Sequence, residues 1–225
     1  MKSMIRFTKE ILCSAILISA VFSTNAQVDS AKNLPNFLLP EFTKCIIKFK
    51  TGNTQTAVIN YNVVDQEIVF MQQDNYMVLD NPQLIDTVYV DNRRLIPVKN
   101  AFYEVVLTGP VSLFIQHKSN VEQAGTPTGY GVTSKTSNSL YVKQVYGPRG
   151  YVNLNIPDGL VITDDTKFWI SRDNSMEKFS TKRQFLKIFK NKEKELNQFI
   201  DSNSIDFNKT DDIIKLCNFC KELLK

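Results

Sequence analysis

Short runs of β-branched and aromatic residues, separated by turn-forming residues, recur through most of the chain. Thr51-Gly52-Asn53 separates two such runs, and Thr108-Gly109-Pro110 separates two others. Short strands at this spacing are typical of an antiparallel meander, sandwich or partly open barrel, whereas parallel βαβ units would need helical stretches between the strands. We predict strands at residues 43–50, 54–61, 67–71, 76–79, 86–90, 95–98, 103–107, 111–118, 140–146 and 167–171.

Alternation within one of these runs indicates which side is buried. Val111, Leu113 and Ile115 share one face of the predicted strand, and Ser112 and Gln116 lie on the other. His117, the single histidine of the chain, continues the apolar side at the end of the strand. Such a histidine is more often a partly buried side chain than a catalyst.

The alternation stops between Ser119 and Ser139, a stretch rich in glycine, serine and threonine. A long segment of this kind is either a binding loop or a flexible hairpin insertion, and we favour the insertion. Gly129-Tyr130-Gly131 is not a phosphate-binding fingerprint, because no strand-then-helix context surrounds it.

The pattern changes to helical spacing near the C-terminus. Thr181 and Gln184 form a capping box ahead of an apolar stripe, and a second amphipathic stretch covers residues 191–203. A third helix is predicted from Thr210, with an acidic first turn at Asp211-Asp212. Helices this short are marginal alone, so they must pack on each other and on the sheet.

These patterns together predict an α+β fold, mainly antiparallel β, with about three short C-terminal helices. We divide the chain into a signal peptide (1–26), an antiparallel β-rich domain (27–175) and a helical segment packed on it (176–225).

The first 26 residues have the three parts of a cleavable secretory signal peptide. Basic residues precede an apolar run at residues 11–22, and small side chains at Thr24 and Ala26 suit the peptidase. The alternative is a membrane anchor, but a spanning helix needs about 20 apolar residues. We therefore expect export to the periplasm, the outer-membrane surface or the medium, with no transmembrane span in the mature chain.

The formal net charge of +4 comes partly from this basic leader. The rest of the chain has no basic stripe with interleaved aromatic residues, so nucleic acid is not an expected partner.

Cys45, Cys217 and Cys220 follow the predicted cleavage point, and an odd number argues against a disulfide framework. Cys217 and Cys220 have the spacing of a redox motif, yet they lie near the end of the last helix and on its apolar stripe. A redox thiol needs the beginning of a helix, so we interpret both as buried structural thiols. Too few other ligand residues exist for a zinc site, and no metal or cofactor is expected.

No catalytic signature accompanies these elements. The pairs Asp164-Asp165 and Asp211-Asp212 are explained by turn and helix-start chemistry. No nucleophile elbow, HExxH, EF-hand or Walker motif is present, so we assign no catalytic residue.

Aromatic residues gather in the half that contains the long loop. Rings that face outward together could stack on a sugar or a peptide, although aromatic residues usually pack within a sheet. The candidate ligand-binding residues are Tyr130, Tyr141 and Trp169.

Three segments give the chain a resemblance to a known group. These are the Asn25-Ala26-Gln27 junction, the segment from Tyr61 to Phe70, and the tail in which residues 185–189 lead to residues 211–215. The chain resembles uncharacterised secreted β-rich proteins of Bacteroidota with a lysine-rich helical tail. The resemblance implies a Gram-negative host and no particular site residues.

Three functions stay open at this point. The leading hypothesis is a non-catalytic cell-envelope module that binds a partner protein or a glycan, through the long loop or the sheet edges. The second is a carrier of a small apolar ligand in a barrel-like cavity, and the third is a hydrolase with an unrecognised site.

We expect mass spectrometry of the exported protein to find an N-terminus at Gln27, because the residues at −3 and −1 there are small. A chain that still begins at Met1 would contradict the signal-peptide interpretation.

Overall fold

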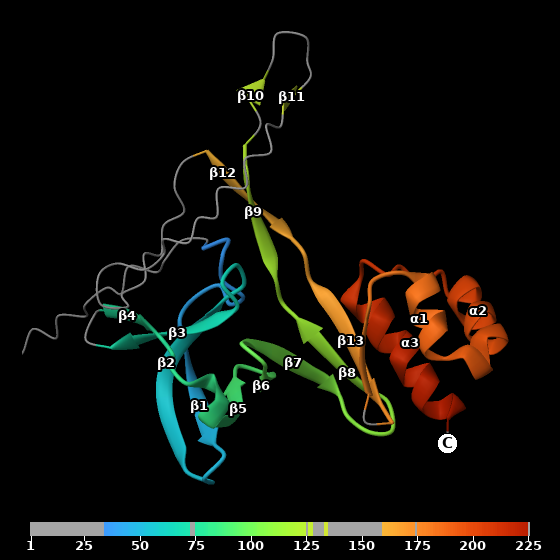
Figure 1. The fold of residues 1–225 in the computed structure, drawn as a ribbon, viewed down its shortest axis with the longest axis horizontal. Helices are drawn as coiled ribbons and strands as arrows, with labels where there is room; N and C mark the ends of the chain where they lie inside the picture. Colours follow the sequence, from blue (N-terminus) through green and yellow to red (C-terminus); the bar gives the residue numbers. More distant parts are fainter. Residues whose placement is uncertain are drawn as a thin grey trace, which may run out of the picture. The chain divides into compact units, whose positions relative to one another are not determined.

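Strands that are neighbours in the sequence mostly pair with one another in one large antiparallel sheet (Figure 1). The computed structural model describes residues 34–72, 75–124, 126–127, 133–134, 159–173 and 175–224, which belong to one compact unit, Ala31–Lys225. Within these residues ten strands form the sheet in the order β14-β13-β8-β7-β6-β5-β1-β2-β3-β4. They are β1 (Thr43–Phe49), β2 (Thr54–Asn62), β3 (Glu67–Gln72), β4 (Asn75–Val78), β5 (Ile85–Val90), β6 (Arg93–Val98), β7 (Ala101–Leu107), β8 (Ser112–Gln116), β13 (Lys167–Arg172) and β14 (Ser175–Phe179).

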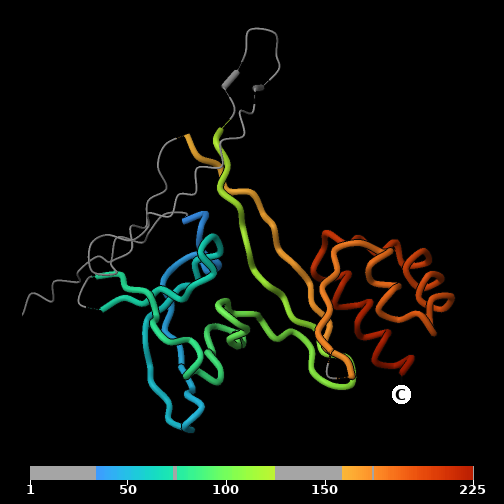
Figure 2. The backbone as a smooth tube through the Cα atoms, in the orientation of Figure 1, coloured from blue at the N-terminus to red at the C-terminus, as the bar shows by residue number. Residues whose placement is uncertain are grey.

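A two-stranded ladder continues from this sheet. β9 (Ser119–Gln123) follows β8 and pairs with β12 (Leu160–Asp164), which precedes β13. Figure 2 shows the backbone of this ladder running on from β8 and β13. The short strands β10 (Thr126–Pro127) and β11 (Thr133–Ser134) pair with each other beyond it.

The chain ends in three α-helices: α1 (Lys182–Ile188), α2 (Glu193–Ser202) and α3 (Thr210–Leu223). Two 3₁₀ turns, η1 (Pro82–Leu84) and η2 (Lys190–Lys192), complete the described elements. The predicted α+β fold with a mainly antiparallel sheet is therefore confirmed, and the sheet is open, not a closed barrel. The domain limits at 26 and 175 stay a prediction.

Part of the predicted loop is a strand. β9 occupies Ser119–Gln123, where alternation gave no signal. Its ladder with β12 lies outside the ten-stranded sheet, so these strands have no core to cover and need no apolar face. β14 was also missed, because its one buried side chain is Phe179. The strand predicted at 140–146 lies outside the described residues.

The N-terminal half of the sheet encloses its own core. Ile59, Val88 and Leu95 are fully buried there, on three different strands. Tyr61 on β2 spans this core: its hydroxyl donates to the Phe102 carbonyl on β7 at 3.2 Å. That bond joins strands that are not neighbours in the sheet order, so β2 and β7 curve toward each other.

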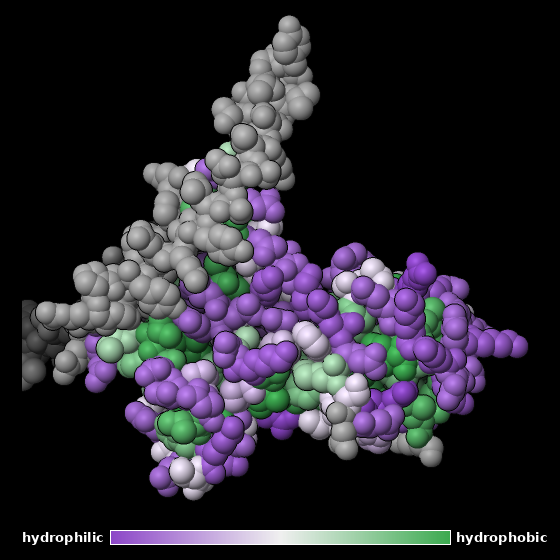
Figure 3. Space-filling model, in the orientation of Figure 1, coloured by the Kyte–Doolittle hydropathy of each residue, from purple (hydrophilic) through white to green (hydrophobic). Residues whose placement is uncertain are grey.

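A second core lies between the helices and β8, β13 and β14. Val111, Leu113 and Ile115 all point into it, as the alternation predicts. Its centre is aromatic: the Phe185 ring is 5.1 Å from that of Phe179 and 5.0 Å from that of Phe189, centroid to centroid. Figure 3 shows hydrophilic residues over much of the helical surface, with hydrophobic ones between them.

The predicted capping box begins α1. The Gln184 amide donates to the Thr181 hydroxyl at 3.3 Å. The Gln184 side chain reaches one residue further back than expected, because its Oε1 accepts from the Ser180 amide at 2.8 Å. Both bonds satisfy amides that a helix start leaves free. The cap fixes where the chain leaves β14 and turns back over the sheet.

Replacing Phe185 by alanine should lower the free energy of unfolding by about 3–5 kcal/mol, because it leaves a cavity among packed rings. Leu84→Ala is the control, since Leu84 is 59% exposed and its loss should cost less than about 0.5 kcal/mol. Urea unfolding of both variants measures the difference. Equal stability would contradict the packing of α1 on β14.

Candidate functional site

His117 lies in a polar network, not in a cleft with a nucleophile. Its Nε2 donates to Glu104 Oε2 at 2.6 Å, and Arg93 donates to the same oxygen at 2.6 Å. Both His117 and Glu104 have side chains that are only 14% exposed. No serine, threonine or cysteine among the described residues bonds to this group. The network therefore joins β6, β7 and the end of β8, which matches the prediction of a partly buried histidine.

The position of this network explains its charge state. Leu95 pairs with Glu104 and Glu104 pairs with Ile115, so the network lies on the sheet face that carries both cores. Burial alone raises the pKa of the Glu104 carboxyl, but the His117 hydrogen bond and the Arg93 charge outweigh it. The pKa is therefore held below its usual value, and Glu104 stays ionised between the two apolar clusters.

Cys217 and Cys220 are free thiols, fully buried on the side of α3 that faces the helical core. Burial raises the pKa of both thiols, that of Cys220 to about 12. A thiol is reactive as the thiolate. These two cysteines consequently belong to the core, in agreement with the sequence interpretation.

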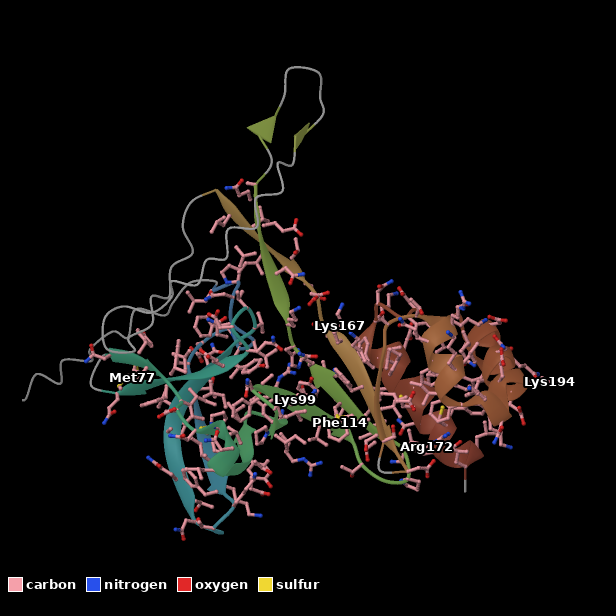
Figure 4. The ribbon with its side chains drawn as sticks, viewed as in Figure 1. Met77, Lys99, Phe114, Lys167, Arg172 and Lys194 are labelled. Atoms are coloured by element: carbon pink, nitrogen blue, oxygen red, sulfur yellow. The ribbon has the colours of Figure 1, made fainter. Side chains whose placement is uncertain are left out.

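The face of the sheet opposite the two cores is the candidate binding surface. We call it the open face, and define it as the positions of β1, β5, β6, β7, β8 and β13 whose side chains point away from the two cores. The described helices contact the other side of the sheet: α3 contacts β8, and the α1 side chains pack against Val111, Leu113 and Ile115. Figure 4 labels Phe114 and Lys167, which belong to the open face.

Trp169 is the one candidate residue that the structure describes, and it lies on the open face. Its ring centroid is 5.5 Å from that of Tyr103, and its Nε1 donates to Gln116 Oε1 at 3.0 Å. Phe114 is directly opposite it on β8. Trp169 is half-buried, so part of the ring is in contact with the sheet and part is accessible. Tyr130 and Tyr141 lie outside the described residues.

Strand register extends this aromatic group across the sheet. Trp169 pairs with Phe114, and Phe114 pairs with Val105. Because Leu95 pairs with Glu104, the next position on β6 places Arg94 opposite Val105, and Arg94 pairs with Tyr89. Tyr89 pairs in turn with Ile46. The result is a cross-strand row on the open face: Ile46, Tyr89, Arg94, Val105, Phe114 and Trp169.

The row is most accessible at its β1–β5 end. Ile46 is 51% exposed and Tyr89 is 43% exposed, and both are among the most exposed large apolar side chains that the structure describes. Several cationic side chains lie on this face. Lys44, Arg94 and Lys178 make no ion pair with a described residue, whereas Lys48 pairs with Asp86 and Lys167 pairs with Asp165. The row therefore combines rings with unpaired positive charge.

Sequence reasoning missed most of this row. Phe114 could have been found, because alternation places it opposite Leu113 and Ile115. Tyr89 and Arg94 could not, because their place in one row with Trp169 depends on the register of five strands, of which β13 is distant in the sequence from the other four. Proximity across a sheet is a property of pairing, and no local pattern encodes it.

No family model, curated protein or solved structure matches this chain. None of the helices in the described part of the chain has both the length and the apolar content to cross a membrane. In the same part of the chain, no group of three histidine, cysteine or acidic side chains is placed to hold a metal ion.

Glu104→Gln should lower the free energy of unfolding by about 1–3 kcal/mol near neutral pH, because Arg93 and His117 lose a charged acceptor. A lowered pKa contributes stability that is complete above the unfolded value of about 4.3 and is lost as pH falls through the folded value. The difference between wild type and variant should therefore shrink toward about pH 2.

Urea unfolding at both pH values measures this effect. Glu177→Gln is the control, because Glu177 is exposed on the edge strand. A difference between wild type and Glu104→Gln that stays constant with pH would show that the Glu104 charge contributes nothing.

Proposed function

We propose that this chain is a non-catalytic module of the cell envelope that binds an anionic glycan through the open face. The observation that carries the proposal is the cross-strand row, in which Arg94 and Val105 lie between Tyr89 at one end and the adjacent rings of Phe114 and Trp169 at the other. Export by the N-terminal signal peptide belongs to the same proposal, and would place the module in the periplasm, on the outer-membrane surface or in the medium.

The chemistry of the row favours a glycan over a peptide helix. A docked helix needs a continuous apolar groove. Here polar groups interrupt the apolar surface: Arg94 pairs with Tyr89, and Gln116 bonds to Trp169. A sugar ring has an apolar face and hydroxyl edges, so it can stack on the aromatic rings while its edges meet the donors.

Charge indicates the kind of glycan. Lys44, Arg94 and Lys178 present positive charge on this side of the sheet without an acidic partner among the described residues. A guanidinium group binds carboxylate or sulfate oxygens through two parallel hydrogen bonds. Acidic sugars therefore fit the row better than neutral ones.

The sheet edges favour a face-binding mode. The edge strands β4 and β14 are short, and β14 presents Glu177 and Lys178 to solvent. Short, charged edges discourage an added strand from a partner. The apolar carrier receives less support, because the sheet is open and does not close into a barrel. The hydrolase receives less support as well, because His117 is already bonded to Glu104, whose carboxylate also binds Arg93.

The test is calorimetric titration of the mature protein with an oligogalacturonate, and with a neutral glucan oligosaccharide as the comparison ligand. Tyr89→Ala should weaken binding of the acidic oligosaccharide about 3- to 10-fold, because one stacking ring is lost. Arg94→Gln should weaken it by a similar factor and reduce its salt dependence.

Val161→Ala is the matched control, because Val161 is 45% exposed and lies on β12, outside the row. Binding that is equal in all three variants would reject the open face. Binding of extended peptides at the same residues, with no response to either oligosaccharide, would reject the glycan and leave a peptide-binding module.

A further inference from the structure

A cavity of about 490 Å³ lies at the end of the N-terminal half of the sheet, and none of its lining residues belongs to the cross-strand row. It is formed by β3, the start of η1, and the ends of β4 and β7. Met77, Leu79 and Phe102 contribute apolar surface, and Glu67 and Asp80 contribute carboxyl groups. Figure 4 labels Met77 on β4. This volume is in the range of small-ligand sites, which are mostly apolar with a few polar groups.

Glu67 has no counter-ion in the described part of the protein. Its Oε2 is buried and makes no hydrogen bond to a described residue, and its carboxyl group forms no ion pair there. Buried polar atoms are nearly always paired, so an orphan oxygen in a cavity wall requires an explanation. Burial raises the pKa of Glu67, and the neighbouring Asp65 charge raises it further. Both effects disfavour the ionised form of Glu67, which has no cation beside it among the described residues.

The residues that line the cavity indicate which ligand could pair with the Glu67 carboxylate. None of the described residues that line it is a lysine, arginine or histidine. The Asp80 carboxylate accepts from the Asn81 amide at 2.8 Å and meets no cation. Metal binding is disfavoured, because no group of three ligand side chains exists in the described residues. The ligand that fits this lining is therefore an organic cation with an apolar body.

We propose that this cavity binds a small organic cation, an ammonium group on an apolar body, with Glu67 as the counter-ion. The ammonium group pairs with the carboxylate of Glu67, which has no other cation among the described residues, and the apolar body packs against Met77, Leu79 and Phe102. Asp80 adds negative potential at the rim. This site is independent of the glycan-binding row, so either assignment can fail alone.

The test is titration of the mature protein with n-hexylammonium, followed by calorimetry and by NMR of the Met77 methyl group. Hexanol has the same apolar body without the charge and should bind at least 10-fold more weakly. Glu67→Gln should weaken hexylammonium binding at least 10-fold and leave hexanol binding unchanged. Asp80→Asn should weaken it about 2- to 3-fold, because Asp80 is exposed and screened by solvent.

Two controls separate binding from folding. Glu41→Gln removes an exposed carboxylate outside the cavity and should bind as wild type does. Thermal unfolding without ligand should show Glu67→Gln to be as stable as wild type or more stable, since it removes a desolvated charge with no partner.

Each opposite outcome overturns the proposal. A large loss of stability in Glu67→Gln would mean that the carboxylate has a structural partner. Equal affinity for hexanol and hexylammonium would make the cavity a purely apolar site. Saturable binding of calcium that Glu67→Gln abolishes would make it a metal site. The absence of saturable hexylammonium binding at millimolar concentration would remove the site altogether.

Discussion

The register of β7, β8 and β13 is the constraint on which the rest of this structure depends. Leu113 and Ile115 face the helices, while Phe114 between them faces the open side together with its partner Trp169. A slip of one residue would exchange these sets and expose the core. The bulge near the end of β7 lies within this pairing, and β8 still presents an unbroken apolar face to α1 and α3.

One face of a continuous sheet carries two separate cores. The N-terminal core is enclosed by the curved sheet itself, in which the Tyr61 hydroxyl of β2 bonds to the Phe102 carbonyl of β7. The C-terminal core is covered by the helices. Between the two cores lies the polar network of Arg93, Glu104 and His117. A network in which opposite charges are paired is tolerated at that position, whereas a single charge without a partner there would be expensive. The chain's single histidine is thereby given a structural role.

Two places in this structure hold charged side chains without a partner of opposite charge among the described residues. The open face holds rings and cations without acidic partners, and the cavity beside β3 holds a carboxylate without a cation. Their charges are opposite, so the two surfaces suit different ligands.

Local patterns determined most of the elements: runs of β-branched and aromatic residues between turn residues located β1 to β8 and β13, and the capping box located α1, because both signals depend on neighbours in the sequence. β9, β12 and β14 were missed, since strands held mainly by backbone pairing need no apolar periodicity. The tertiary structure alone decided which strands lie side by side, and so placed Tyr89 in line with Trp169 and left Glu67 without a partner. Pairing between distant segments follows from the free energy of the whole sheet, and no short stretch of residues contains that information.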